Sequence, residues 1–240
     1  MRRTIARYAL VVAGFVAGPR SLAAIDAQLA KRHFNQASSL ARNDGGKFWG
    51  VELGGPMIFA DPSTREVVAN QQDRDGVLIA RDGVFVGHLP ESVGIANTAV
   101  EWAGTRWTMI MWPLPSALYS RGRLMMHESF HRVQDLAGLP AASPANSHMD
   151  TKDGRLYLRL EWRALDAALL CAGEARRVAA RDALLFRAAR LSRFPKAADE
   201  ERALNMNEGL AEYTGWMLCG LPHAAAESRG ALALEQNEWN

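Results

Sequence analysis

The sequence predicts an α+β fold in which a β-rich half precedes a helical half. Short apolar segments separated by turn residues fill residues 48–113 and are typical of strands. From residue 116 to residue 240, apolar residues instead recur at helical spacing between Pro, Gly and Asn interruptions. Apolar residues make up 48% of the chain, and its length is sufficient for one substantial core. We therefore expect a single domain over residues 25–240, preceded by a separate segment at residues 1–24.

The β-rich half divides into three predicted hairpins, and we expect an antiparallel sheet. In each hairpin, two β-prone runs flank a short turn such as Asp61-Pro62-Ser63, Arg81-Asp82-Gly83 or Ala103-Gly104. The paired runs are 56–60 with 66–69, 76–80 with 84–86, and 98–102 with 106–112. The last hairpin leads directly into the first helix of the second half.

The helical half contains three further predicted helices after that first one. A long helix runs from about residue 155 until it is broken before Pro195. Another covers about residues 198–218, and a short one follows the Pro222-His223 break. Residues 140–154, rich in Pro, Ser, Asn and Gly, are expected to form an irregular loop.

The first helix carries the motif His127-Glu128-Ser129-Phe130-His131, which has the form H-E-x-x-H. Its flanks form an apolar helical stripe, and Gly138 and Pro140 are typical stop signals. One helical turn between the two histidines allows both imidazoles to reach a single tetrahedral Zn²⁺. Glu128 would then lie beside the metal, where it can take a proton from water.

A second motif, Asn207-Glu208-Gly209-Leu210-Ala211-Glu212, lies in the predicted helix at 198–218. Together the two motifs resemble the gluzincin zinc metallopeptidases, in which an Asn-Glu pair opens a second helix. The resemblance implies that Glu208 is the third zinc ligand and that Glu212 supports a ligand histidine. Carboxylates four residues apart share one helical face, which suits these two roles. Glu208 lies 77 positions after His131, so an inserted helical segment must fold back.

The resemblance also implies a zincin-like fold and a zinc-dependent hydrolase that cleaves peptide or protein substrates, with Glu128 as general base. In such folds an exposed edge strand holds the substrate by strand addition, and a strand within residues 97–112 is the candidate here. The alternative function is a non-catalytic, zinc-stabilised secreted binding or cell-envelope protein. A structural zinc site needs no base and uses a fourth protein ligand, so Glu128 favours the enzyme.

Several further residues are candidates with open roles. His148, Tyr157 and Tyr213 are rival hydrogen-bond donors to the oxyanion of a tetrahedral intermediate. Glu161, a carboxylate in an apolar stretch, is the second choice for the third ligand, and an ordinary salt bridge is its simpler explanation. The loop containing Asn146, His148, Asp150 and Asp153 is another possible source of ligands.

The first 24 residues are predicted to be a secretory signal peptide, with early arginines, an apolar run and small residues near a cleavage point. We therefore expect an exported, periplasmic or secreted protein with no stable membrane span after removal. Removal also takes four arginines and no acid, which changes the formal net charge from +2 to −2. A nearly neutral chain does not indicate nucleic-acid binding. Cys171 and Cys219 form either one disulfide or two buried thiols.

Overall fold

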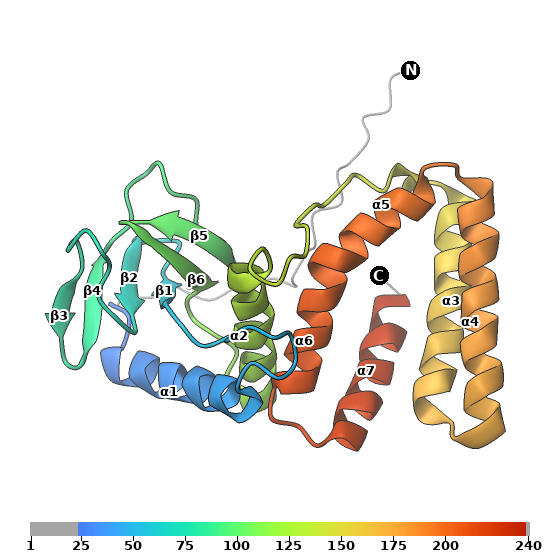
Figure 1. Ribbon diagram of the computed structural model, residues 1–240, viewed down its shortest axis with the longest axis horizontal. Helices are drawn as coiled ribbons and strands as arrows, with labels where there is room; N and C mark the ends of the chain where they lie inside the picture. Colours follow the sequence, from blue (N-terminus) through green and yellow to red (C-terminus); the bar gives the residue numbers. More distant parts are fainter. Residues whose placement is uncertain (1–23, 239–240) are drawn as a thin grey trace, which may run out of the picture.

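The computed structural model describes residues 24–238, so the predicted signal peptide lies outside the described residues except for Ala24. The architecture is α+β, as expected, with a sheet in the first half and helices in the second (Figure 1). Among the described residues, no helix is long and apolar enough to cross a membrane. That the domain covers residues 25–240 stays a prediction.

The three expected hairpins are present in one six-stranded sheet. The strands are β1 (Met57–Ala60), β2 (Glu66–Ala69), β3 (Ile79–Arg81), β4 (Val84–His88), β5 (Thr98–Trp102) and β6 (Thr105–Met111). Their order across the sheet is β3-β4-β2-β1-β6-β5. The two edge strands of the sheet are therefore β3 and β5.

The sheet is mixed, which corrects the expectation of a purely antiparallel sheet. β1 pairs with β2 in antiparallel fashion and with β6 in parallel, Ile58 lying opposite Met109. The reason is burial: β6 has apolar side chains on both faces and takes a central position, while the half-buried β5 remains at the edge. The parallel pairing joins strands from two different hairpins, so the sequence of a single hairpin does not predict it.

Helices cover one face of the sheet. The helix α1 (Ala27–Asp44), for which the sequence analysis made no prediction, begins at Asp26, whose carboxylate accepts a hydrogen bond from the Leu29 N–H at 2.9 Å. Its Phe34 ring stacks on Phe59 of β1 at 4.3 Å between centroids. The helix α2 (Leu118–Val133) packs beside it and contributes the buried Met125 and Met126 to the same core.

The predicted long helix is two helices, α3 (Lys152–Leu170) and α4 (Gly173–Arg193), which pair side by side. The expectation of one continuous helix was wrong because Cys171 and Ala172 are extended and Gly173 has a left-handed φ of 58°. The chain between α2 and the second motif therefore forms a hairpin that projects from the molecule (Figure 1). A short 3₁₀ helix, Ser147–Asp150, precedes it within the expected loop.

The remaining chain folds back to α2, as the spacing of the two motifs required. It consists of α5 (Ala197–Leu204), the π-helical turn η2 (Asn205–Gly209) and α6 (Leu210–Leu218), which together cover the helix predicted at 198–218. α6 packs against α2, and the last helix, α7 (His223–Glu238), packs against α3 and α6. α2 consequently lies between the sheet and the returning helix (Figure 1).

Candidate metal centre

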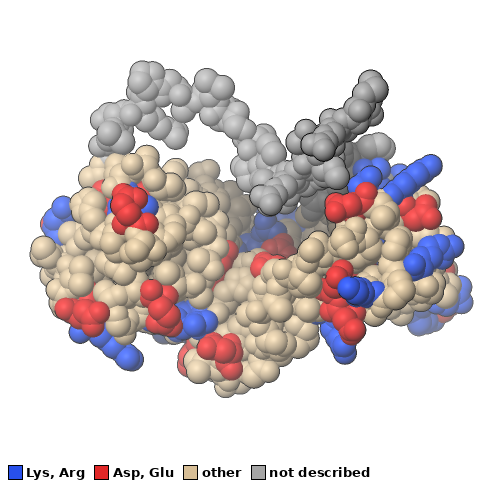
Figure 2. Space-filling model, turned by 90° about the horizontal axis from the view of Figure 1, so that it is seen from above, with Lys and Arg blue, Asp and Glu red and all other residues tan. Residues whose placement is uncertain are grey.

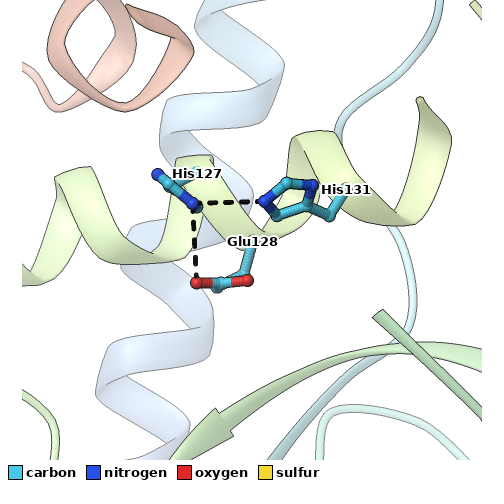
Figure 3. A group of neighbouring side chains, drawn as sticks. All are labelled: His127, Glu128 and His131. Carbon is cyan, nitrogen blue, oxygen red and sulfur yellow. Dashed lines mark hydrogen bonds and ion pairs between the residues drawn. The ribbon is translucent and has the colours of Figure 1, made fainter. Parts of the chain in front are cut away.

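The two histidines of the first motif lie on one face of α2 and point toward one another (Figure 3). Their Nε2 atoms are 3.2 Å apart. Both side chains are largely buried, with exposed fractions of 18% for His127 and 14% for His131. The separation follows from the four-residue spacing, since residues i and i+4 lie one above the other on a helix.

Glu208 completes a triangle with these two nitrogen atoms. Its Oε2 lies 3.5 Å from the Nε2 of His127 and 3.5 Å from the Nε2 of His131. For zinc bonds of about 2.0–2.1 Å, the edge of a tetrahedron is about 3.3–3.4 Å. All three edges of the triangle are close to this length, so the donor atoms fit three corners of a tetrahedral zinc site.

The π-helical turn η2 presents Glu208 to the histidines. Turns of this kind are rare and are frequent at functional sites. Within it, the Asn207 amide donates a hydrogen bond to Glu208 Oε1 at 3.0 Å and another to Ser143 Oγ at 2.8 Å. One carboxylate oxygen is thereby held by the protein, and the other faces the two histidines.

A carboxylate supports His127 from behind. Glu212 Oε2 lies 3.3 Å from Nδ1 of His127, and the other oxygen of Glu212 binds Arg123. Because a carboxylate accepts hydrogen bonds, the His127 proton lies on Nδ1 and the lone pair on Nε2 faces His131. Glu208 and Glu212, one turn apart, thus contact opposite sides of the same imidazole.

Gln134 has the same role for His131. Its Oε1 lies 3.1 Å from Nδ1 of His131, and its amide nitrogen donates to the carbonyl oxygens of Pro140 at 2.8 Å and Met206 at 3.4 Å. These two donated bonds fix the orientation of the amide, so that its oxygen accepts the His131 proton. The lone pair on His131 Nε2 therefore also points into the triangle.

Three potential metal-ligand atoms consequently face one point. The two imidazole nitrogens and the carboxylate oxygen lie 3.2–3.5 Å from one another. A positive charge shared among them, whether a proton or a metal ion, would hold the three atoms together. Two imidazoles and one carboxylate are a ligand set of catalytic zinc sites, in which a fourth position stays open. The residues therefore fit a zinc ion.

Glu128 is the buried acid of the site. His127, Glu128 and His131 each offer an atom within 4.8 Å of the others. The Glu128 Oε1, however, is 3.9 Å from His127 Nε2, farther than either Glu208 contact (Figure 3). Its other oxygen is buried and has no hydrogen-bond partner among the described residues. Glu128 thus lies beside the triangle rather than at one of its corners.

Burial raises the pKa of Glu128 to about 7, an effect that His127 opposes and that the charges of Glu208 and Glu212 increase. For His127, burial is outweighed by the hydrogen bond to Glu212 and by the neighbouring carboxylates, which raise its pKa. For His131, burial dominates and lowers the pKa despite the bond to Gln134. A carboxyl group with a pKa near neutrality suits proton transfer.

The triangle opens into a cavity of ≈ 280 Å³. Two walls are the histidine face of α2 and the turn η2, and a third is the start of the edge strand β5. The lining residues are Asn97, Thr98, Ala99, Arg106, His127, Glu128, His131, Gln134, Ala141, Asn207 and Glu208. The predicted strand within 97–112 therefore does border the two histidines.

The structure does not bring the three rival donors into this cavity. The buried His148 bonds through Nε2 to Glu201 at 2.8 Å, beside the helical hairpin. Tyr213 is half exposed and packs on Phe48. Tyr157 lies under the Arg193 guanidinium. Each has a local contact that holds it elsewhere, and none is among the cavity-lining residues.

Glu161, the second choice for the third ligand, belongs to a buried ionic cluster. Its Oε2 lies 2.6 Å from Nη2 of Arg190, whose guanidinium also binds both carboxylate oxygens of Glu201 at 2.7 and 2.8 Å. Glu161 is therefore held by a salt bridge, with Arg190 as its partner. Glu208 is the carboxylate that contacts both histidines. Cys171 and Cys219 are free cysteines, and only Cys219 is buried.

Gln134 and Arg123 were missed by the sequence analysis. Gln134 is three residues after His131, so its position on the same helical face was a usable signal. Arg123 precedes His127 by four residues in the same way, and its partner Glu212 was already a candidate. No protein-family model, curated protein or solved structure matches this chain.

Proposed function

We propose that this protein is a zinc-dependent hydrolase that cleaves peptide bonds and has a zincin-like arrangement of sheet and helices. One observation carries the proposal: three potential ligand atoms lie at tetrahedral spacing beside a buried carboxyl group, one oxygen of which has no hydrogen-bond partner in the described part of the chain. A structural zinc site would require a fourth protein ligand and no acid. The open cavity and the position of Glu128 support the catalytic alternative.

His127, His131 and Glu208 would hold the ion, with Glu212 and Gln134 fixing the two imidazoles. Bound zinc supplies Lewis acidity, which polarises a carbonyl oxygen and acidifies water. Glu128 accepts the proton of the attacking water on a carboxylate oxygen and then delivers it to the leaving amine. Its raised pKa is appropriate for both transfers, because a group near neutrality both gains and loses a proton readily.

The edge strand β5 supports a peptide as substrate. Thr98 and Ala99 line the cavity, and among the described strands β5 pairs with β6 alone, so no described strand occupies its second edge. An extended peptide added to this edge would run past the histidines. A peptide held in this way offers its carbonyl groups at regular intervals, and one of them can reach the metal centre.

The test compares zinc content and peptide hydrolysis in the wild type and Glu208→Ala. We expect about one zinc per wild-type chain by elemental mass spectrometry and a strong loss in the variant. Asp199→Ala is the matched control, because Asp199 lies on the preceding helix and its side chain is 82% exposed. Zinc retained in Glu208→Ala would refute the three-ligand assignment. A zinc-loaded wild type that cleaves no member of a fluorogenic peptide library would refute the peptidase assignment.

A further inference from the structure

The helix α4 is the outermost element of the helical half (Figure 1). Its main neighbour is α3, with a small contact to α5 near its end. The residues that face these neighbours are the buried Ala183 and Arg190. The opposite side of the helix has no neighbour among the described elements, and its side chains are exposed.

This outward face combines large apolar residues with arginines. Leu184 is 66% exposed, Leu185 59% and Val178 37%. The side chains of Arg177 and Arg181 are 72% and 69% exposed, and each forms an ion pair with an acid of the same helix, Arg177 with Glu174 and Arg181 with Asp182. Spacings of three, four and seven residues place the three apolar residues and the two arginines on the same side of the helix. A soluble helix ordinarily presents polar residues to water, so adjacent exposed leucines call for a partner.

The charge of the hairpin indicates the chemistry of that partner. Residues 152–193 contain ten Lys and Arg against five Asp and Glu, a formal net charge of +5. The other described residues contain fourteen Lys and Arg against twenty-one Asp and Glu, a formal net charge of −7. Figure 2 shows several Lys and Arg at the end of the molecule that the hairpin forms, with Asp and Glu among them. The nearly neutral chain is therefore strongly polarised.

We propose that the outward face of α4 binds the surface of an anionic lipid bilayer, with the helix lying in the interface. In a helix that lies in the interface, cations contact lipid phosphates while exposed apolar side chains enter the acyl boundary. The protruding face of one helix also complements a flat, deformable surface better than a concave one. The leucines distinguish lipid from a polyanion that is bound by charge alone.

The test measures binding of the full chain to vesicles by co-sedimentation. The vesicles contain either phosphatidylcholine alone or phosphatidylcholine mixed with phosphatidylglycerol, at low and at high salt. We expect binding only to the anionic vesicles, and weaker binding at high salt. The double variant Arg177→Gln/Arg181→Gln should bind about 25-fold more weakly, at about fivefold per basic residue. Leu184→Ser/Leu185→Ser should lose binding by at least about tenfold.

Lys31→Gln/Lys47→Gln is the matched control, because it removes two exposed cations from the other half of the chain. Its binding should stay within about twofold of wild type, since charges farther away than a Debye length contribute little. All variants keep the same N-terminal segment, so differences between them belong to α4. The assay needs no hydrolytic activity, so it stands apart from the proposed function.

Several results would overturn the proposal. Wild type that does not bind anionic vesicles would do so directly. An equal loss in the lysine control would assign binding to overall charge. Binding to a DNA duplex as strong as to vesicles, and unchanged in the leucine variant, would indicate a general polyanion site. If sedimentation equilibrium shows that wild type is a dimer and the leucine variant is a monomer, this face binds a second copy of the chain.

Discussion

The substitution Glu128→Gln should stabilise the metal-free protein while it removes hydrolysis. Glu128 is 4% exposed, and one of its oxygens has no hydrogen-bond partner among the described residues. The buried site raises its pKa from 4.5 to about 7. At about 1.4 kcal/mol per pKa unit, the ionised carboxylate lowers the free energy of unfolding by about 3 kcal/mol. A neutral amide of the same shape does not carry this penalty.

The pH dependence follows from the direction of the shift. Below pH 4.5 the carboxyl group is protonated in both the folded and the unfolded protein, so the penalty is absent. It grows as the pH rises from 4.5 to about 7 and is constant above that. We therefore expect the stabilisation of Glu128→Gln to be about 3 kcal/mol at pH 8 and close to zero at pH 4.

The assay is thermal unfolding of wild type and Glu128→Gln in the presence of a chelator at both pH values. For a chain of this size, about 3 kcal/mol corresponds to a rise of about 6–12 °C in the midpoint temperature at pH 8. Asp199→Asn, at an exposed acid, should show no shift. The zinc-loaded Glu128→Gln protein should retain the metal and lose peptide hydrolysis by about 10²–10⁴-fold. A variant that is less stable at pH 8, or equally stabilised at both pH values, would refute the reasoning.

Three other perturbations test the partner of His127 and two buried groups away from the site. Glu212→Gln should weaken zinc affinity by about 10–100-fold in a competitive chelator titration, because His127 loses its charged partner; unchanged affinity would contradict that role. Glu201→Ala should lower the free energy of unfolding by about 3–5 kcal/mol in urea, since the buried Arg190 loses a two-bond partner; a loss below about 1 kcal/mol would argue against the ionic cluster. Burial and two nearby arginines lower the pKa of His33 to about 4, so the free energy of unfolding should fall as the pH decreases from 6.5 to 4. His33→Gln should remove this part of the pH dependence. Wild type and variant with the same pH profile of stability would contradict the prediction.

Local sequence patterns determined the elements of this protein that depend on neighbouring residues. The alternation of apolar residues and the turn signals were sufficient for all three hairpins. The four-residue spacing of His127 and His131 was sufficient to place both imidazoles on one helical face. These features need only the geometry of one helix or one hairpin, which the sequence specifies directly.

Contacts between distant segments required the tertiary structure. The parallel pairing of β1 with β6 depends on burial across the whole sheet, and the break at Cys171–Gly173 depends on α4 packing back onto α3. Glu208 was indicated by a motif, but its distance of 3.5 Å from both histidines exists only because the chain returns after 77 residues.

The same division applies to the surroundings of the two histidines. The sequence named Glu212 through a resemblance, and it could not say which imidazole the carboxylate would contact. The position of Gln134 three residues after His131 was a local signal, but the orientation of its amide depends on its partners Pro140 and Met206, which only folding brings near. The placement of the two histidines follows from local spacing, whereas their hydrogen-bond partners come largely from segments that only folding brings together.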